Sequence, residues 1–193
     1  WLTANDGWWN RPPQVRYVRA SIYDTAEQAL NAFDTQSVDI AMTRSINASR
    51  YSGSLNTFSI TARTRQLEVL LVNRAYKDFK SDDNGQNLLR QAISYAINRS
   101  ELISSAYQNM ATVAYTPIPS GTWLSNESTI RDIYDPLMAA SLLDSAGYKL
   151  ADDGNRYKDG KKMESLRLLV YDEPGSTART NAANKIVDQL AAV

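Results

Sequence analysis

Apolar residues recur three and four positions apart in five stretches of the chain, which is the spacing of one helical face. The pattern is clearest at residues 88–97, where Leu89, Ala92 and Ala96 share a face. In the last stretch, Ala183, Ile186 and Leu190 are expected to point inward, together with Val187. The predicted helices lie at residues 26–33, 88–97, 99–107, 136–146 and 177–190.

Polar residues mark where three of these helices begin. Asp24 with Glu27, and Asn98 with Glu101, have the separation of a capping box, in which each residue caps the other's backbone. Ser176 is expected to cap the last helix. Because Asn98 follows one helical face and precedes another, the chain is predicted to bend there and start a second helix.

The sequence contains signals for both ends of the helix predicted at 136–146. Asp135 can cap it, and Pro136 occupies the first helical position, where proline is tolerated. Gly147 can adopt positive φ and end the helix, with Tyr148 folding back on Leu143 in a Schellman motif.

Five further stretches have the apolar or alternating pattern of strands. The first two flank the first helix, which predicts a βαβ unit with parallel strands. The fourth is apolar on both faces and is expected to be buried on both. Strands and helices together predict an α/β fold with a mixed sheet flanked by helices. The predicted strands lie at residues 14–23, 38–42, 57–62, 67–73 and 166–170.

Composition removes several classes of chemistry. The chain has no Cys and no His, which excludes thiol nucleophiles, Cys/His zinc sites and Ser-His-Asp triads. Lys+Arg and Asp+Glu both number 21, so there is no electrostatic case for nucleic acid as a partner. No apolar run is long enough to span a membrane. The first residues contain neither an initiator Met nor a signal peptide, so we expect a piece of a longer protein.

Few residues point to chemistry. Asp172 and Glu173 follow a predicted strand, where α/β proteins gather ligands, but the same pair also fits a solvated turn or a carboxylate-based hydrolase. Residues 152–155 resemble a hairpin turn more than a calcium loop, because the EF-hand spacing is missing. No metal and no cofactor is expected. Three tryptophans could line a cleft or pack at a lobe junction: Trp1, Trp8 and Trp9.

Four segments resemble the family 5 extracellular solute-binding proteins, the oligopeptide, dipeptide and nickel receptors of bacterial ABC importers. Residues 89–99 are similar to the family's Val-Arg-Gln-Ala-Ile-x-Tyr-Ala-Ile-Asp-Arg segment, and residues 140–148 to its Ala-x-x-Leu-Leu-x-x-Ala-Gly-Tyr segment. Residues 4–9 and 29–40 are similar in a weaker way, and Gln36 stands where the family has glycine. In these segments Asn98, Arg99 and Gly147 are structural residues.

The resemblance implies a type II periplasmic-binding-protein-like fold, with residues 1–60 in the first lobe and residues 61–193 in the second. It implies a binding protein and not an enzyme. The partners would be a peptide or small solute and the permease subunits of the importer. The location would be extracellular or periplasmic, with a lipoprotein anchor on the full-length protein.

Three segments match positions near the family's ligand cleft: residues 70–73, 114–117 and 170–173. The second lies within residues 111–126, where prolines at 117 and 119 exclude a helix and predict an extended loop. The resemblance also implies that an acidic anchor for a peptide's α-amine lies downstream of residue 193. A nickel- or haem-type ligand, or a ligand-sensing domain of a transcription regulator, stays open. The cleft candidates are Leu71, Asn73, Tyr115, Thr116, Tyr171 and Asp172.

Overall fold

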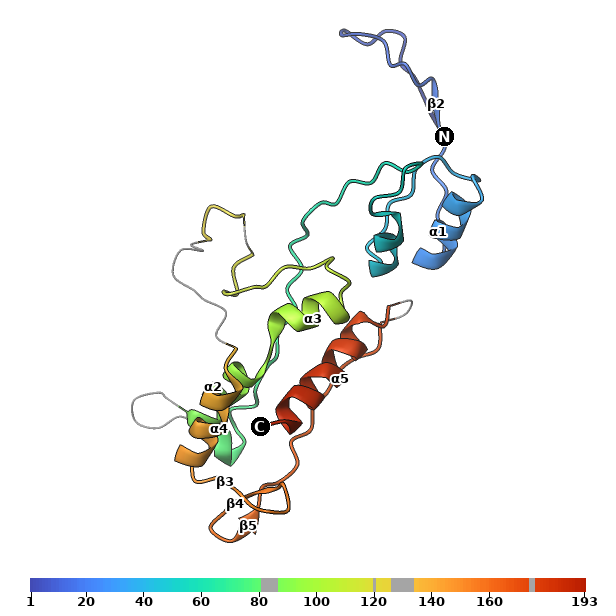
Figure 1. Cartoon of the computed structure of the whole chain (residues 1–193). Coiled ribbons are helices and arrows are strands. Elements are labelled where there is room, and N and C mark those ends of the chain that lie inside the picture. The colour runs from blue at the N-terminus through green and yellow to red at the C-terminus, as the bar shows by residue number, and fades with distance from the viewer. Residues whose placement is uncertain (81–86, 120, 126–133, 174–175) are drawn as a thin grey trace. The chain divides into compact units, whose positions relative to one another are not determined.

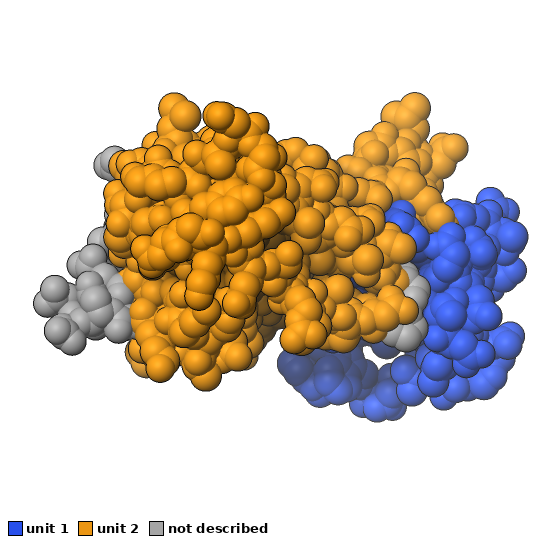
Figure 2. Space-filling view, turned by 90° about the horizontal axis from the view of Figure 1, so that it is seen from below, with its two compact units in different colours: residues 1–48 blue, residues 49–193 orange. Residues whose placement is uncertain are grey.

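The computed structural model describes residues 1–80, 87–119, 121–125, 134–173 and 176–193. The chain forms two compact units, residues 1–48 and residues 49–193 (Figure 2). Two 3-10 helices, η1 (Ile46–Tyr51) and η2 (Lys77–Phe79), accompany the α-helices and strands given below.

In the first unit, two short strands precede helix α1 (Figure 1). Strand β1 (Leu2–Thr3) pairs antiparallel with β2 (Tyr17–Val18), so the strand predicted over 14–23 is limited to two residues. Residues 38–42 form no strand, and Ile40 within them is 86% exposed. The prediction of a parallel βαβ unit is therefore wrong for this unit, because the second parallel strand is missing and the pair that forms is antiparallel.

Helix α1 (Ala26–Asp34) is the predicted first helix, capped one residue later than expected. The Thr25 hydroxyl accepts a hydrogen bond from the Gln28 N–H, and the Gln28 side chain accepts one from the Thr25 N–H, both at 3.2 Å. Thr25 takes this role because its backbone is extended, with φ −130° and ψ 153°. The capping box is thus Thr25 with Gln28, and not Asp24 with Glu27.

In the second unit, α2 (Leu88–Ala96) leads directly into α3 (Arg99–Ser105). The Asn98 side chain accepts a hydrogen bond from the Glu101 N–H at 3.0 Å, which confirms the predicted break and cap. The reciprocal half of the box is absent. The Asn98 N–H donates instead to Gln189 on helix α5 (Ala178–Ala191).

Helix α4 (Pro136–Ser145) has the predicted ends. The Asp135 side chain accepts a hydrogen bond from the Met138 N–H at 2.9 Å. Gly147 has φ 92°, and the Tyr148 N–H donates to the Leu143 carbonyl at 2.9 Å, as in a Schellman motif.

Helix α5 begins at Ala178 after Thr177, so Ser176 is not its N-cap residue. The Ser176 hydroxyl still accepts a long hydrogen bond of 3.4 Å from the Ala178 N–H. The buried residues of α5 are Ala178 and Ala182, whereas Val187, predicted to point inward, is half exposed. The helix therefore packs through small side chains near its start.

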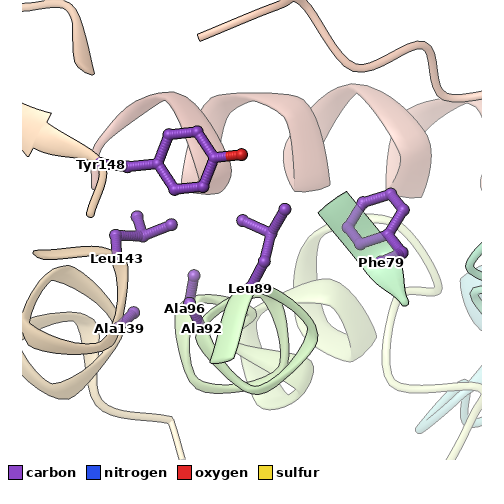
Figure 3. Packing of buried hydrophobic residues seen from close by; sticks show 7 residues of the cluster. All are labelled: Phe79, Leu89, Ala92, Ala96, Ala139, Leu143 and Tyr148. Atoms are coloured by element: carbon purple, nitrogen blue, oxygen red, sulfur yellow. The ribbon is translucent and has the colours of Figure 1, made fainter. Parts of the chain in front are cut away.

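The core of the second unit lies between α2 and α4 (Figure 3). Ala92 is 1% exposed and Ala139 is fully buried, and these two methyl side chains let the helices approach closely. The larger side chains Leu89, Leu143 and Tyr148 lie on one side of this contact (Figure 3). The buried cluster comprises Phe79, Leu89, Ala92, Ala96, Ala139, Leu143 and Tyr148.

A small antiparallel sheet follows α4, with β4 (Arg156–Lys158) between β3 (Lys149–Leu150) and β5 (Lys161–Lys162). The turn between β4 and β5 has positive φ at both Asp159 and Gly160, which is the geometry of a type I′ hairpin. Arg156 ties this sheet to α4, because its guanidinium donates to Asp144 at 2.8 Å and to the Tyr148 carbonyl at 2.7 Å.

Three other predicted strands of the second unit, at 57–62, 67–73 and 166–170, are not paired in any sheet of the described residues. Leu71 is 84% exposed, so the prediction that 67–73 is buried on both faces is wrong. These segments have the composition of strands, but a strand forms only where a neighbour supplies hydrogen bonds to its backbone. Among the described residues, the sheets are the two small antiparallel ones.

Candidate binding surface

The predicted ligand residues lie on three segments of the second unit that belong to no helix and no sheet. Leu71 and Asn73 lie on residues 67–73, Tyr115 and Thr116 on residues 111–119, and Tyr171 and Asp172 on residues 166–173. Leu71 is 84% exposed, Tyr115 43% and Tyr171 68%. Their side chains are therefore accessible to a solute.

Arg179 joins the first and the third of these segments. Its Nη2 lies 2.6 Å from Glu68 Oε1 and its Nε 3.1 Å from Glu68 Oε2, which is a two-pronged pair with the carboxylate. Its Nη1 lies 3.1 Å from Glu173 Oε2 in an ion pair. Its guanidinium carbon stands 3.9 Å from the centre of the Tyr171 ring, which is a cation–π contact.

The environment of Arg179 strengthens these contacts. The side chain is only 15% exposed, whereas its partners Glu68 and Glu173 are about half exposed. The hydrogen bonds to Glu68 raise the pKa of Arg179 above its ordinary value, so the guanidinium is charged at any working pH. Burial raises the pKa of nearby Tyr107, and the negative charge of Glu68 adds to this effect. Tyr107 is therefore a neutral phenol at neutral pH.

The remaining candidates are held by local contacts. The Thr116 hydroxyl donates to the Ile118 carbonyl at 2.9 Å, and the Asn73 side-chain oxygen accepts from the Ala75 N–H at 3.0 Å. Asp172 is exposed between two residues that contact Arg179. Among the described contacts, those of Arg179 join the first and third segments and do not extend to Tyr115.

The three structural candidates form part of the scaffold. Asn98 caps α3, and Gly147 ends α4 with positive φ. The Arg99 guanidinium donates to the Ser94 hydroxyl at 3.2 Å and lies 3.4 Å from the Ser94 carbonyl, so it links α3 back to the end of α2. Arg99 therefore supports the bend that Asn98 begins.

The chemistry of this surface suits binding. Glu173 is engaged in an ion pair with Arg179. Within the described part of the chain, no three His, Cys, Asp or Glu residues are grouped so as to hold a metal ion. A groove of about 220 Å³ between α3 and α5 contains none of the predicted ligand residues. Its lining is Ser105, Ala106, Asn181, Asn184, Lys185 and Asp188.

The tryptophans of the first unit are largely exposed. Trp8 and Trp9 have ring centres 5.4 Å apart, and Trp9 is 82% exposed. The Arg19 guanidinium lies 5.7 Å from the centre of the Trp1 ring.

Sequence reasoning missed Arg179 and Glu68. The two residues are 111 positions apart, and Glu68 alternates with apolar residues as any exposed strand residue would. One signal was available at Arg179. A long cation in the first turn of a helix opposes the helix dipole, which suggests that it has a tertiary partner.

The whole chain, residues 1–193, matches the family described as bacterial extracellular solute-binding proteins, family 5 middle. Haem-binding protein A of Haemophilus influenzae is 34% identical over 90 residues, which is 45% of this chain and 16% of that protein. The dipeptide-binding protein of Escherichia coli is 26% identical over 148 residues, which is 75% of this chain and 26% of that protein.

A crystal structure of NikA from Brucella suis in complex with Fe(III)-EDTA resembles this chain with a TM-score of 0.63. The two are 22% identical, and the match covers 83% of this chain and 32% of NikA. The fold is therefore that of the type II periplasmic-binding-protein-like class, as predicted. The chain spans at most about a third of the length of these three proteins.

The chain belongs to the family 5 bacterial extracellular solute-binding proteins. This is a family of binding proteins and not of enzymes, which removes the carboxylate-based hydrolase considered for Asp172 and Glu173. Among the helices that the structure describes, none is long and apolar enough to cross a membrane.

Proposed function

We propose that the protein is the solute-binding component of a bacterial ABC importer, which binds peptides between two lobes and delivers them to a membrane permease. The observation that carries the proposal is the family match over all 193 residues. In this proposal, residues 1–60 belong to the first lobe and residues 61–193 to the second. The full-length protein would be extracellular or periplasmic, held at the membrane by a lipid anchor.

Two of the three candidate segments, residues 67–73 and 166–170, favour a peptide as the solute. Residues 67–73 and 166–170 are not paired in a sheet of the described residues, so their backbone N–H and C=O groups can pair with an extended ligand. Exposed Tyr115 and Tyr171 can contact side chains of different sizes. Such a surface accepts many peptides, because backbone hydrogen bonds do not depend on the sequence of the peptide.

A metal chelate or haem is the second candidate. It is favoured by the likeness to a haem-binding protein and to a structure holding Fe(III)-EDTA. This chain has no His and no Cys to coordinate a metal directly, so it would hold a chelate through contacts to the chelating molecule.

Ligand-induced stabilisation of the full-length protein tests both candidates. The probes are tri-alanine, haemin and Fe(III)-EDTA, followed by calorimetry for any that raises Tm. A ligand at a hundred times its Kd adds ~2.7 kcal/mol of stability, a shift that is easily measured. We expect tri-alanine to raise Tm. A shift with haemin or Fe(III)-EDTA alone would select the second candidate, and no shift with any probe would contradict the proposal.

Replacement of Tyr115 tests the surface itself. Loss of a ligand contact worth ~1.4 kcal/mol weakens binding about tenfold, and this is the effect expected for Tyr115→Ala. Tyr134→Ala is the matched control, because Tyr134 is also 43% exposed and has no predicted role in binding. Equal affinities of the two variants would remove Tyr115 from the binding surface.

The sensor of a transcription regulator differs from a transport receptor in what is attached to this chain. A signal peptide with a lipid-attachment cysteine upstream supports the receptor. A helix-turn-helix in the same position supports the sensor, which would bind the same solute for a different purpose.

A further inference from the structure

The Arg179 side chain contacts two segments that are not paired in any sheet of the described residues. Two of its nitrogens bind Glu68 on residues 67–73, and the third faces Glu173 on residues 166–173. The flat face of its guanidinium covers the Tyr171 ring. Since Arg179 belongs to α5, these contacts attach both segments to one helix.

Arg179 stands where a cation is locally unfavourable. It is the second residue of α5, next to the helix N-terminus, and the first turn of α5 has no acidic residue. A positive charge at this position opposes the helix dipole and is therefore locally unfavourable. The tertiary contacts with Glu68, Glu173 and Tyr171 therefore outweigh a local penalty.

The contacts also need arginine in particular. A two-pronged pair with Glu68 requires the fork of a guanidinium, and stacking on Tyr171 requires its flat face. Lysine keeps the charge but can supply neither feature. Arg179→Lys therefore separates the geometric role of this side chain from its charge.

We propose that Arg179 is a positioning residue. It holds residues 67–73 and residues 166–173 in fixed positions next to helix α5. Leu71 and Asn73 lie on the first segment, and Tyr171 and Asp172 on the third. As a consequence, which rests on the proposed function, Arg179 controls solute affinity without touching the solute. Tyr171 remains 68% exposed despite the stacked guanidinium, so most of the residue stays accessible to a ligand.

Limited proteolysis with subtilisin, with the cut sites located by mass spectrometry on the full-length protein, tests this role without a ligand. In Arg179→Lys we expect cleavage to become about tenfold faster in both segments and to stay unchanged in α2 and α3, because only the bidentate and stacking contacts are lost. Glu68→Gln should loosen residues 67–73 more than residues 166–173. This selective pattern would not arise from a general loss of stability.

Two variants serve as controls. Arg167→Lys makes the same change at an exposed arginine of the third segment and should leave the cleavage rate as in the wild type. Lys185→Met, also on α5, breaks the 2.7 Å ion pair with Glu101 of α3 and should loosen α3 and not the two segments. Unchanged cleavage of both segments in Arg179→Lys would overturn the proposal.

Binding of tri-alanine measured with the same variants tests the consequence for the solute. We expect Arg179→Lys to weaken binding about tenfold and Arg167→Lys to leave it unchanged. Faster cleavage with unchanged affinity would overturn the link to solute binding. If the wild type binds none of the three probes while Arg179→Lys loosens the segments, the positioning role stands and the proposed function fails.

Discussion

The backbone N–H of Asn98 donates a hydrogen bond to the side-chain oxygen of Gln189, 3.1 Å away and 91 residues later in the chain. Gln189 in turn donates from its amide nitrogen to Glu101 at 2.8 Å. Helix α5 thus supplies the half of the cap that the Asn98–Glu101 pattern assigns to Glu101. The start of α3 is therefore completed by a tertiary contact.

Gln189→Ala should lower the free energy of unfolding by about 1 kcal/mol, because it removes two hydrogen bonds and leaves the Asn98 N–H without this acceptor. Urea denaturation measures the change. Asp188→Ala is the control, since Asp188 is the exposed neighbour on the same helix. A loss of equal size in both variants would show that the bond to Asn98 contributes nothing of its own.

The pKa of Glu101 should depend on Lys185. Hydrogen bonds from Lys185, and secondly from Gln189, lower this pKa below the ordinary value of a glutamate. A lowered folded-state pKa means that the stabilisation is complete above the unfolded-state pKa, ~4.3. It is lost as pH falls through the folded-state pKa.

Titration of the Glu101 carboxyl carbon by NMR measures this pKa directly. In Lys185→Met the midpoint should rise toward that of an ordinary glutamate, and acid should destabilise this variant less steeply than the wild type. Lys161→Met, at an exposed lysine of β5, should leave the midpoint in place. An unmoved midpoint in Lys185→Met would contradict the assigned cause.

Gly147→Ala should destabilise the protein by about 1 kcal/mol, because an L-residue at φ 92° is strained. Crowding adds little, since a Cβ there would lie 3.5 Å from the flexible end of the Lys158 side chain. Thermal or urea denaturation checks the loss. Gly7→Ala is the control, because Gly7 does not have positive φ. Similar losses at both glycines would argue against backbone strain as the cause.

Gln36→Gly should stabilise the first unit by about 0.5–1 kcal/mol, in the opposite direction to the change at Gly147. Gln36 has φ 57° and ends α1 in a Schellman motif, with the Ser37 N–H donating to the Ala32 carbonyl at 2.8 Å. Glycine removes the strain and keeps these backbone bonds. The same replacement at Gln14, which lacks positive φ, should bring no gain. A lower Tm for Gln36→Gly would count against this interpretation.

The correct sequence predictions concern interactions that span only a few residues. Asn98 caps α3, Asp135 caps α4, and Gly147 ends α4, each through hydrogen bonds within five residues. Such contacts depend on side-chain type and spacing, which the sequence contains in full. The cap of α1 was displaced by one residue because Asp24 and Thr25 are both competent and the local backbone decides between them.

The incorrect predictions concern partners distant in the chain. Residues 67–73 have an apolar strand pattern, but no alternation can supply the neighbour that a strand needs, and Leu71 is exposed. The same holds for residues 38–42, which form no strand and do not pair with β2 as predicted. Residues near the family's cleft could be named by resemblance alone, and their role in binding stays a prediction.

The sequence by itself determined the helices of this protein, where most of them start and stop, and the family to which it belongs. Helical faces and caps depend on residues a few positions apart, so their physics is local. Only the tertiary structure decided that Arg179 joins Glu68 to Tyr171 and Glu173, and that Gln189 completes the cap at Asn98. The contacts of Arg179 with Glu68 and of Gln189 with Asn98 link residues 111 and 91 positions apart, and they form only when the packing of α5 has closed the chain between them.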